Sequence, residues 1–322
     1  MKKALPGWLL FAVVMSSMPL LVSTGSLRIF IFANFIAIFA MSWDILSGYT
    51  GYVSFGHPFI IGIASYATAI MTGRMGYPLY LSMPIATAVG VGAGMLFFLP
   101  GLRLRGNYFC LITLAFMIVA HSLFIAVRPD ITGGTKGIPG LPIIMLGAIP
   151  NYYLSIGLML GIAAFLWYIG RSDLGKIFKA IRMDEDILAT SGLNSFKYKL
   201  IAFTLSALTA SIGAVFYTHY IGTVSPSSVF AITFLINIIV AALIGGQGTI
   251  LGPIMGAYFI TFLLETIRPY EIFAGPQRYL FYGAIALGIY VYNTRGFYGI
   301  AQDIAKFYQR KRGKGEQYGQ VT

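Results

Sequence analysis

Long apolar runs alternate with short polar segments along almost the whole chain of 322 residues. Most of the runs are close to the ~20 residues that an α-helix needs to cross the hydrocarbon core of a bilayer. Each run therefore predicts a membrane-spanning helix. The runs cover residues 7–22, 28–46, 55–72, 77–99, 107–127, 152–170, 200–221, 229–244, 251–267 and 279–292. The predicted fold is all-α, a polytopic membrane helix bundle of about 10 transmembrane helices.

The first run follows Lys2 and Lys3, a pattern shared by cleaved secretory signals and by retained first spans. Its length and the lack of a clear small-x-small cleavage site favour a retained helix. A cleaved signal would remove one span and leave the other assignments unchanged. We expect a transmembrane domain over residues 1–294 and a basic tail over residues 295–322.

Composition supports a membrane protein, because 57% of the residues are hydrophobic and only 10% are charged. Soluble domains carry about 25% charged residues. The net charge of +12 does not indicate nucleic-acid binding. The basic residues lie in short loops between apolar runs, where they act as topology signals, and not on one folded face.

The distribution of Lys and Arg predicts the orientation. Ten spans place both termini on one side, and with that side in the cytoplasm the inner segments hold sixteen Lys and Arg residues and the outer segments six. Cytoplasmic loops carry the excess of positive charge in membrane proteins. Both termini and the charged segment, residues 171–199, are therefore expected inside, and the outer loop, residues 128–150, outside.

The charged segment contains ten of the 32 charged residues of the chain. A helix is predicted over residues 173–191, and Gly192 is expected to end it. Such a helix can be a solvated linker, lie on lipid or dock in a groove of a partner protein. The acidic run Asp184-Glu185-Asp186 disfavours anionic lipid and favours a protein groove.

Two glycine-rich stretches, residues 46–59 and 244–256, interrupt the apolar pattern. A broken helix is tolerated at membrane depth only where protein or a wet cavity satisfies the backbone, and transporters place such breaks on the solute path. Small residues also allow helices to pack closely, and the sequence leaves both interpretations open. The candidate path residues are Gly48, Gly51, Ser54, Gly56, Gly245, Gly246, Gly248 and Gly252.

No arrangement of residues predicts catalysis, a metal site or a cofactor. Cys110 is the only cysteine, the three histidines are far apart, and no P-loop sequence is present. Asp44 lies close to a span end, where we expect solvation at the membrane interface. The chain is therefore not expected to be an enzyme. Uphill transport would need an ion gradient or another subunit.

Several passages resemble the permease subunits of bacterial branched-chain amino acid ABC importers, specifically the M-type subunit of the high-affinity leucine/isoleucine/valine system. The similarity extends over about residues 34–265 in the same order. It rests on LSGYTGYVSFGHPF, GLRLRGNYFCLITLAF, ITGGTKGIPGLP, KAIRMDEDILATSGLNSFKYKLIAFTLSALTASIGAVFY, VSP and GGQGTILGPIMGA.

The resemblance implies a permease in the bacterial inner membrane. It implies a second homologous permease subunit, two cytoplasmic ABC ATPases and a periplasmic solute-binding protein as partners. The charged segment corresponds to the region that couples the family's permeases to their ATPases. The residues that carry this correspondence are Arg182, Asp184, Glu185, Ala189 and Gly192. Ile187 and Leu188 depart from the family pattern, which usually has Ala there.

The expected function is therefore inward transport of Leu, Ile or Val by alternating access, driven by ATP hydrolysis on partner subunits. Two alternatives stay open. The chain could be a self-sufficient secondary transporter or channel for a small solute, or an ABC permease for urea or amides. The scarcity of acidic residues within the spans and the large charged segment favour the ABC permease.

Overall fold

The computed structural model describes residues 14–103, 108–267, 283–285, 288 and 296–299 of the chain. In these ranges the regular structure is helical apart from an isolated bridge between Ile138 and Val224. Within the described part of the chain, six helices are long and apolar enough to cross a membrane, which confirms the all-α membrane bundle. Parts of the predicted spans 7–22 and 279–292, and most of the tail 295–322, lie outside the described residues. The number of ten spans stays a prediction.

The described helices follow the predicted apolar runs, with ends that differ by a few residues. In chain order they are α2 (Thr24–Trp43), α3 (His57–Gly73), α4 (Leu79–Phe98), α5 (Tyr108–Ala126), α6 (Pro129–Thr132), α7 (Ala148–Arg171), α8 (Asp173–Met183), α9 (Glu185–Thr190), α10 (Ser195–Ile221), α11 (Pro226–Val229), α12 (Ile232–Gly245) and α13 (Leu251–Ile267). A short π-helix, Asp44–Gly48, extends α2, and a 3₁₀ turn, Gly101–Arg103, follows α4.

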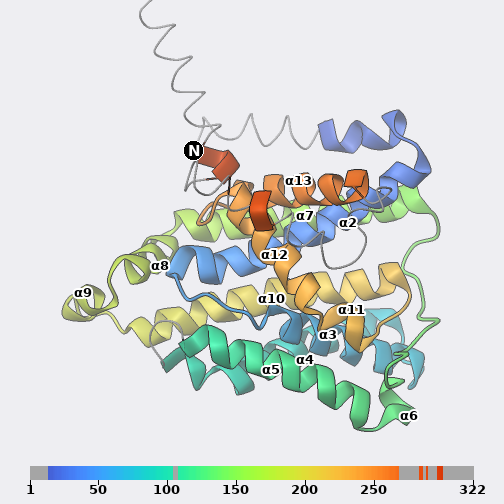
Figure 1. The fold of residues 1–322 in the computed structure, drawn as a ribbon, viewed down its shortest axis with the longest axis horizontal. Helices are drawn as coiled ribbons and strands as arrows, with labels where there is room; N and C mark the ends of the chain where they lie inside the picture. The colour runs from blue at the N-terminus through green and yellow to red at the C-terminus, as the bar shows by residue number, and fades with distance from the viewer. Residues whose placement is uncertain (1–13, 104–107, 268–282, 286–287, 289–295, 300–322) are drawn as a thin grey trace, which may run out of the picture.

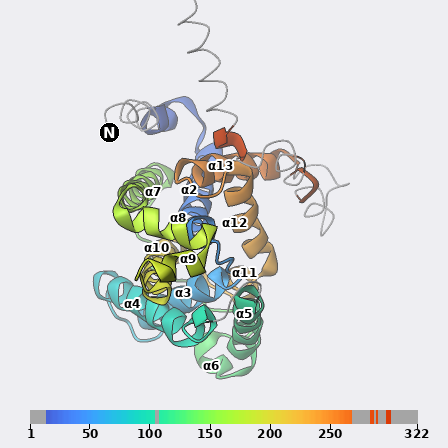
Figure 2. The ribbon, with the colours of Figure 1, turned by 90° about the vertical axis from the view of Figure 1, so that its left-hand side faces the viewer.

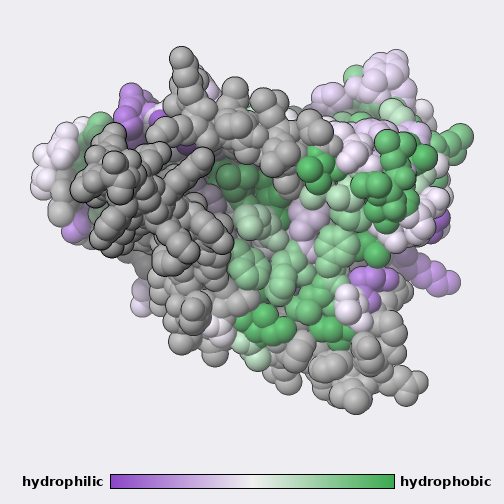
Figure 3. All heavy atoms as spheres, turned by 90° about the horizontal axis from the view of Figure 1, so that it is seen from above, coloured by the Kyte–Doolittle hydropathy of each residue, from purple (hydrophilic) through white to green (hydrophobic). Residues whose placement is uncertain are grey.

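The long helices run roughly along one direction, with α8 and α9 at one end of the bundle and α6 at the other (Figure 1). Viewed along that direction, α7, α12 and α13 form the upper part and α3, α4 and α5 the lower part (Figure 2). Seen from the α13 side, the described surface is mainly hydrophobic in the middle and more hydrophilic towards the two ends (Figure 3). This arrangement is typical of a bundle that spans a bilayer.

Helix α2 lies at the centre and packs against α7, α10, α12 and α13. Its apolar residues point in all directions, as expected for a helix with no solvent-facing side. The polar side chain of Asn34 is satisfied inside the bundle. Its Nδ2 donates to Ser155 Oγ on α7 at 2.9 Å, and its Oδ1 accepts a hydrogen bond from the hydroxyl of Tyr258 on α13. One amide thus links three helices.

Small residues let α4 approach its neighbours α3 and α10. A Cβ atom added at Gly90 would lie 2.5 Å from Ser211 Oγ and 2.8 Å from Ala64 Cβ, which is closer than real Cβ contacts. A Cβ added at Gly92, two residues further along α4, would meet no atom within 4 Å. Glycine is therefore required for packing at Gly90 and not at Gly92.

From Gly51 the chain is not helical until α3 begins, and protein groups satisfy its backbone. Trp43 Nε1 donates to Ser54 O at 2.8 Å, and Ser54 N donates to Ser47 Oγ at 3.1 Å. Phe55 N donates to Thr113 Oγ1 at 3.0 Å. Gly51 has a φ of 78°, which suits glycine. The predicted break in the first glycine-rich stretch is confirmed, and buried protein groups support its backbone.

The outer loop is tied to the segment that follows α10. Ile138 and Val224 exchange two backbone hydrogen bonds of 2.8 and 3.1 Å, and Leu141 N donates to Gly222 O at 2.9 Å. His219, near the end of α10, has Nδ1 2.8 Å from Pro142 O and Nε2 2.8 Å from Thr68 Oγ1. The loop is therefore held in a fixed position against α10 and the residues that follow it.

The packing at α4 gives a first prediction. Gly90→Ala inserts a methyl group between α4, α3 and α10 and should lower the free energy of unfolding by about 1–3 kcal/mol. Gly92→Ala is the matched control and should leave stability unchanged or slightly higher. Thermal unfolding of the detergent-purified variants measures both. Equal melting temperatures for the two variants would contradict the close approach at Gly90.

Candidate functional site

The charged segment folds into α8 and α9 at one end of the bundle (Figure 1). The single helix predicted over residues 173–191 is wrong at Asp184, where the backbone is extended with φ −163° and ψ 116°. Aspartate is favoured just before the first turn of a helix, so this residue can end α8 and begin α9. The stop predicted at Gly192 is confirmed, because its φ of 77° is in the left-handed region.

The two faces of α8 differ strongly. Phe178 and Ile181 are buried against the bundle, whereas Lys176 and Lys179 are exposed. Met183, at the end of the helix, is 88% exposed. The helix thus presents a surface of cations with an apolar tip, which is a suitable contact for a partner protein.

Glu185 is the centre of a buried polar cluster that joins α9 to the rest of the protein. Its Oε1 accepts from Lys199 Nζ at 2.8 Å and from Ser195 Oγ at 2.7 Å, and its Oε2 accepts from Tyr52 Oη at 2.5 Å. Lys199 Nζ also donates to Tyr52 Oη at 2.9 Å. The cluster joins α9, the start of α10 and the first glycine-rich stretch.

The electrostatics of this cluster favour a permanent ion pair. Only 3% of the Lys199 side chain and 20% of the Glu185 side chain are exposed. Burial raises the pKa of Glu185, but the hydrogen bonds from Lys199, Tyr52 and Ser195, together with the charge of Lys199, lower it to about 2. Glu185 is therefore ionised at every physiological pH.

A second contact, which we name the junction, brings the two glycine-rich stretches together. It consists of Asp44, Gly48, Arg182, Gln247 and Gly248. Asp44 Oδ1 accepts a hydrogen bond from Gly248 N at 2.8 Å. Arg182 donates through Nη1 to Gly48 O and through Nη2 to Gln247 Oε1 at 3.3 Å. One side chain of the charged segment therefore bonds to both stretches.

Asp44 differs from the sequence expectation of interfacial solvation, because its side chain is fully buried in the junction. Asp44 is the first residue of the π-helix, and π-helical turns are frequent at functional sites. The backbone N–H of Gly248 compensates part of the cost of burying its carboxyl group.

Only some of the predicted path residues lie at the junction. Gly48, Gly51 and Gly248 lie close together, since an added Cβ at Gly51 or Gly248 would approach the Arg182 side chain. Gly56 lies apart, against Phe98 and Thr113. Ser54 stays within the first stretch, where its Oγ accepts a hydrogen bond from Gly56 N at 3.2 Å.

In the second stretch, Gly245 ends α12 and Gly252 already belongs to α13. A Cβ at Gly245 would collide with the backbone of Gly252, so both serve close packing of these helices. Gly246, with φ 120°, lies between them in the non-helical part. The predicted break of residues 244–256 is therefore shorter, because helix resumes at Leu251.

Sequence reasoning missed the residues that hold the charged segment in place: Lys199, Tyr52, Ser195 and Gln247. Lys199 stands at the start of an apolar run, where a lysine indicates topology. No local pattern connects it with Glu185. A tyrosine within a glycine-rich stretch could have indicated a packing contact, but its partner is 133 residues away in the chain.

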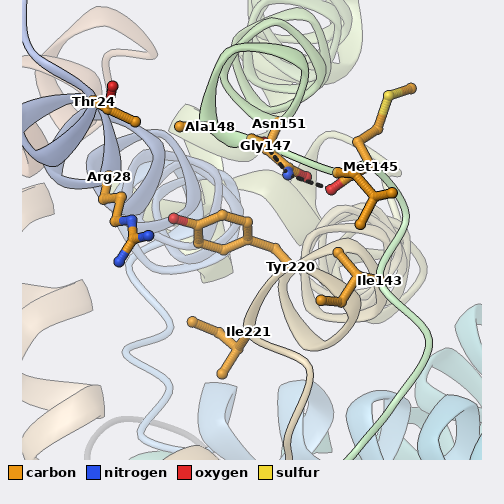
Figure 4. A pocket seen from close by; sticks show the side chains of 10 residues that line it. Thr24, Arg28, Ile143, Met145, Gly147, Ala148, Asn151, Tyr220 and Ile221 are labelled. Carbon is orange, nitrogen blue, oxygen red and sulfur yellow. Dashed lines mark hydrogen bonds between the residues drawn. The ribbon is translucent and has the colours of Figure 1, made fainter.

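The opposite end of the bundle contains an open pocket of about 530 Å³ (Figure 4). Its walls come from the N-terminal end of α2, the residues before and within the start of α7, and the end of α10. Arg28 and Tyr220 extend into the space, and Asn151 donates to Met145 O and Gly147 O at 2.7 Å each (Figure 4). The pocket lies at the end where a solute would enter if the charged segment is cytoplasmic.

Residues 25–290 match the family described as branched-chain amino acid transport system / permease component, and the chain belongs to this family. The high-affinity branched-chain amino acid transport system permease protein LivM of Salmonella typhimurium is 26% identical, over 95% of this chain and 77% of that protein. LivM of Escherichia coli is 27% identical, over 79% of this chain and 66% of that protein.

More distant relatives have other solutes in their names. The ribose import permease protein RbsC of Haemophilus influenzae is 22% identical over 61% of this chain and 62% of that protein. A solved inward-facing structure, described as a metal-chelate type ABC transporter, has a TM-score of 0.51 and 17% identity and covers 91% of this chain and 99% of that chain. The protein is an ABC transporter permease.

The Glu185 cluster gives a pH-dependent prediction. The folded pKa of about 2 is below the unfolded value of about 4.3, so ionised Glu185 stabilises the fold above pH ~4.3 and this stabilisation is lost as the pH falls towards 2. Glu185→Gln should therefore destabilise α9 at pH 7, by about 1–3 kcal/mol, and less at pH 3. Hydrogen exchange at the amides of α9, corrected for intrinsic rates, measures the difference.

Asp173→Asn provides the control. Asp173 pairs with Lys176 at 2.8 Å, but both side chains are largely exposed, so its loss should have little effect at either pH. An effect of Glu185→Gln that stays constant from pH 7 to pH 3, or that Asp173→Asn reproduces, would argue against the buried ion pair.

Proposed function

We propose that this permease moves branched-chain amino acids, Leu, Ile or Val, inward across the bacterial inner membrane. Membership of the family over residues 25–290 supports the transport role. The names of the two LivM relatives, which align with 95% and 79% of the chain, support the choice of solute. The described residues contain no cluster of metal-ligand side chains. The energy for transport is supplied by partner subunits.

The partners are a second homologous permease subunit, two cytoplasmic ABC ATPases and a periplasmic solute-binding protein. The charged segment is the contact for one ATPase, with Arg182, Asp184, Glu185, Ala189 and Gly192 in or beside it. The observation that carries this proposal is the junction, because Arg182 connects a helix at the aqueous end to both glycine-rich stretches.

The mechanism follows from this connection. Closure of the ATPases on ATP moves α8 and α9 as a unit, because buried side chains fix both helices to the bundle. The displacement reaches the π-helix after α2 and the turn before α13 through Arg182. Glycine-rich stretches at Gly48–Gly56 and Gly245–Gly252 change conformation more easily than continuous helix, which suits them to open and close a path.

The path for an apolar amino acid needs mainly apolar walls and a few polar groups, since tight binding would slow release. The solute-binding protein supplies most of the specificity and docks at the end that carries the outer loop, residues 128–150. The bonds between this loop and Val224, Gly222 and His219 give it a fixed shape for such a contact.

The solute of a related permease is the second candidate. The ribose permease RbsC and the autoinducer 2 permease LsrC are among the relatives at 22–26% identity. Reconstitution of the permease with the ATPases and binding protein encoded beside it separates the candidates. Labelled Leu, Ile or Val should enter proteoliposomes only with ATP. Uptake of ribose alone would change the solute, and gradient-driven uptake by the isolated chain would contradict the ABC mechanism.

Two substitutions test coupling in the same assay. Glu185→Lys places a second cation beside buried Lys199, and Gly192→Val forces a β-branched residue into φ 77°. Both variants should hydrolyse ATP with at least tenfold lower uptake per ATP while inserting normally. Gly192→Asn is the matched control, because asparagine tolerates this conformation and the site has no atom within 4 Å of an added Cβ.

Normal uptake per ATP in both Glu185→Lys and Gly192→Val would remove the case for coupling through the charged segment. Equal loss in Gly192→Val and Gly192→Asn would show that the backbone conformation is not the cause.

A further inference from the structure

A small pocket of about 260 Å³ lies where α7 meets α8, at the same end of the bundle as the charged segment. Its lining includes Tyr49, Trp167, Arg171, Lys179 and Gly248. The transport mechanism proposed above does not use it. Two of the described lining side chains are cations, and none of the described lining residues is acidic.

Each of the two cations is positioned by an aromatic ring. The guanidinium carbon of Arg171 lies 4.2 Å from the centre of the Trp167 ring, and Lys179 Nζ lies 4.9 Å from the centre of the Tyr49 ring. Cations held over aromatic faces keep their charge and their outward N–H donors available. The pocket is thus a fixed pair of positive groups.

Two other cations of the charged segment have carboxylate partners, whereas Arg182 donates to Gly48 O and Gln247 Oε1. Lys176 pairs with Asp173 and Lys199 with Glu185, at 2.8 Å in both cases. In the part of the chain that the structure describes, Arg171 and Lys179 have no such ion pair. Asp44 interacts with Lys179 at longer range, but it does not line the pocket and it bonds to Gly248 N. An anion could therefore compete favourably for these two cations.

The position of the pocket selects the kind of anion. Arg171 is the last residue of α7, a helix long and apolar enough to cross the bilayer. On the same helix, Phe165 and Tyr168 are exposed, and Trp167 forms part of the pocket. Aromatic residues and cations at the end of a membrane span mark the level of the lipid headgroups. Acyl chains could run along the exposed face of α7 below this level.

We propose that this pocket binds the phosphate of an anionic phospholipid, with Arg171 and Lys179 as the two cationic contacts. Basic pockets between transmembrane helices are known recognition sites for lipid headgroups. Since Arg171 ends α7 and Lys179 lies on α8, one bound headgroup connects the two helices across Ser172. The inference does not depend on which solute the permease carries.

The test measures lipid binding to the full-length chain in detergent by native mass spectrometry. Phosphatidylglycerol should bind more tightly than phosphatidylcholine. Arg171→Gln with Lys179→Gln should weaken phosphatidylglycerol binding by about thirtyfold, since each cation near an anionic lipid contributes roughly fivefold. Lys176→Gln with Lys197→Gln removes the same charge from the same segment outside the pocket and should keep binding near the wild-type value.

Two further arms fix the interpretation. Arg171→Lys keeps the charge and should bind phosphatidylglycerol within about threefold of wild type, which guards against misfolding of the double Gln variant. Inorganic phosphate should compete only weakly, because it lacks the acyl chains that pack along α7. Unchanged lipid binding in Arg171→Gln/Lys179→Gln, an equal loss in the Lys176/Lys197 control, or phosphate binding as tight as that of the lipid would overturn the proposal.

Discussion

Backbone polar groups inside a membrane bundle need protein partners wherever the helix stops, and the rest of this structure depends on how that need is met. The chain leaves helical geometry between α2 and α3 and again between α12 and α13. At each place a backbone group that lacks a partner within a helix bonds to a side chain, that of Asp44 or that of Arg182 in the charged segment. Asp44 accepts a hydrogen bond from the N–H of Gly248, and Arg182 donates one to the carbonyl of Gly48. The two interruptions therefore support one another.

This mutual support explains why a charged helix stays attached to an apolar bundle. Its apolar face, with Phe178 and Ile181, is buried, and Arg182 extends from its end into the junction. Three residues after Arg182, Glu185 accepts a hydrogen bond from Lys199 and so forms a second polar cluster. The two ends of the bundle differ in this respect, because backbone bonds between Ile138 and Val224 hold the outer loop. Side-chain charges organise one end and backbone pairing the other.

The apolar runs predicted most of the helices because length and hydropathy depend only on local sequence. The same is true of Gly192, where a glycine after a helical pattern predicts the stop. The helix interruption at Asp184 was not predictable, since the residues around it continue the helical period and tertiary contacts of Glu185 decide the bend. Asp44 was placed at the interface because its burial depends on Gly248, which lies in the distant second glycine-rich stretch. The junction joins residues about 200 positions apart in sequence, which no local pattern encodes.

The Glu185 cluster also has a consequence for biosynthesis. Its carboxylate meets Tyr52, which emerges early from the ribosome, and Lys199, which belongs to the next helix to be made. Until α10 has entered the membrane, Lys199 cannot neutralise Glu185 in a buried position. The final shape of α9 is thus acquired only after insertion of α10, late in the assembly of the permease.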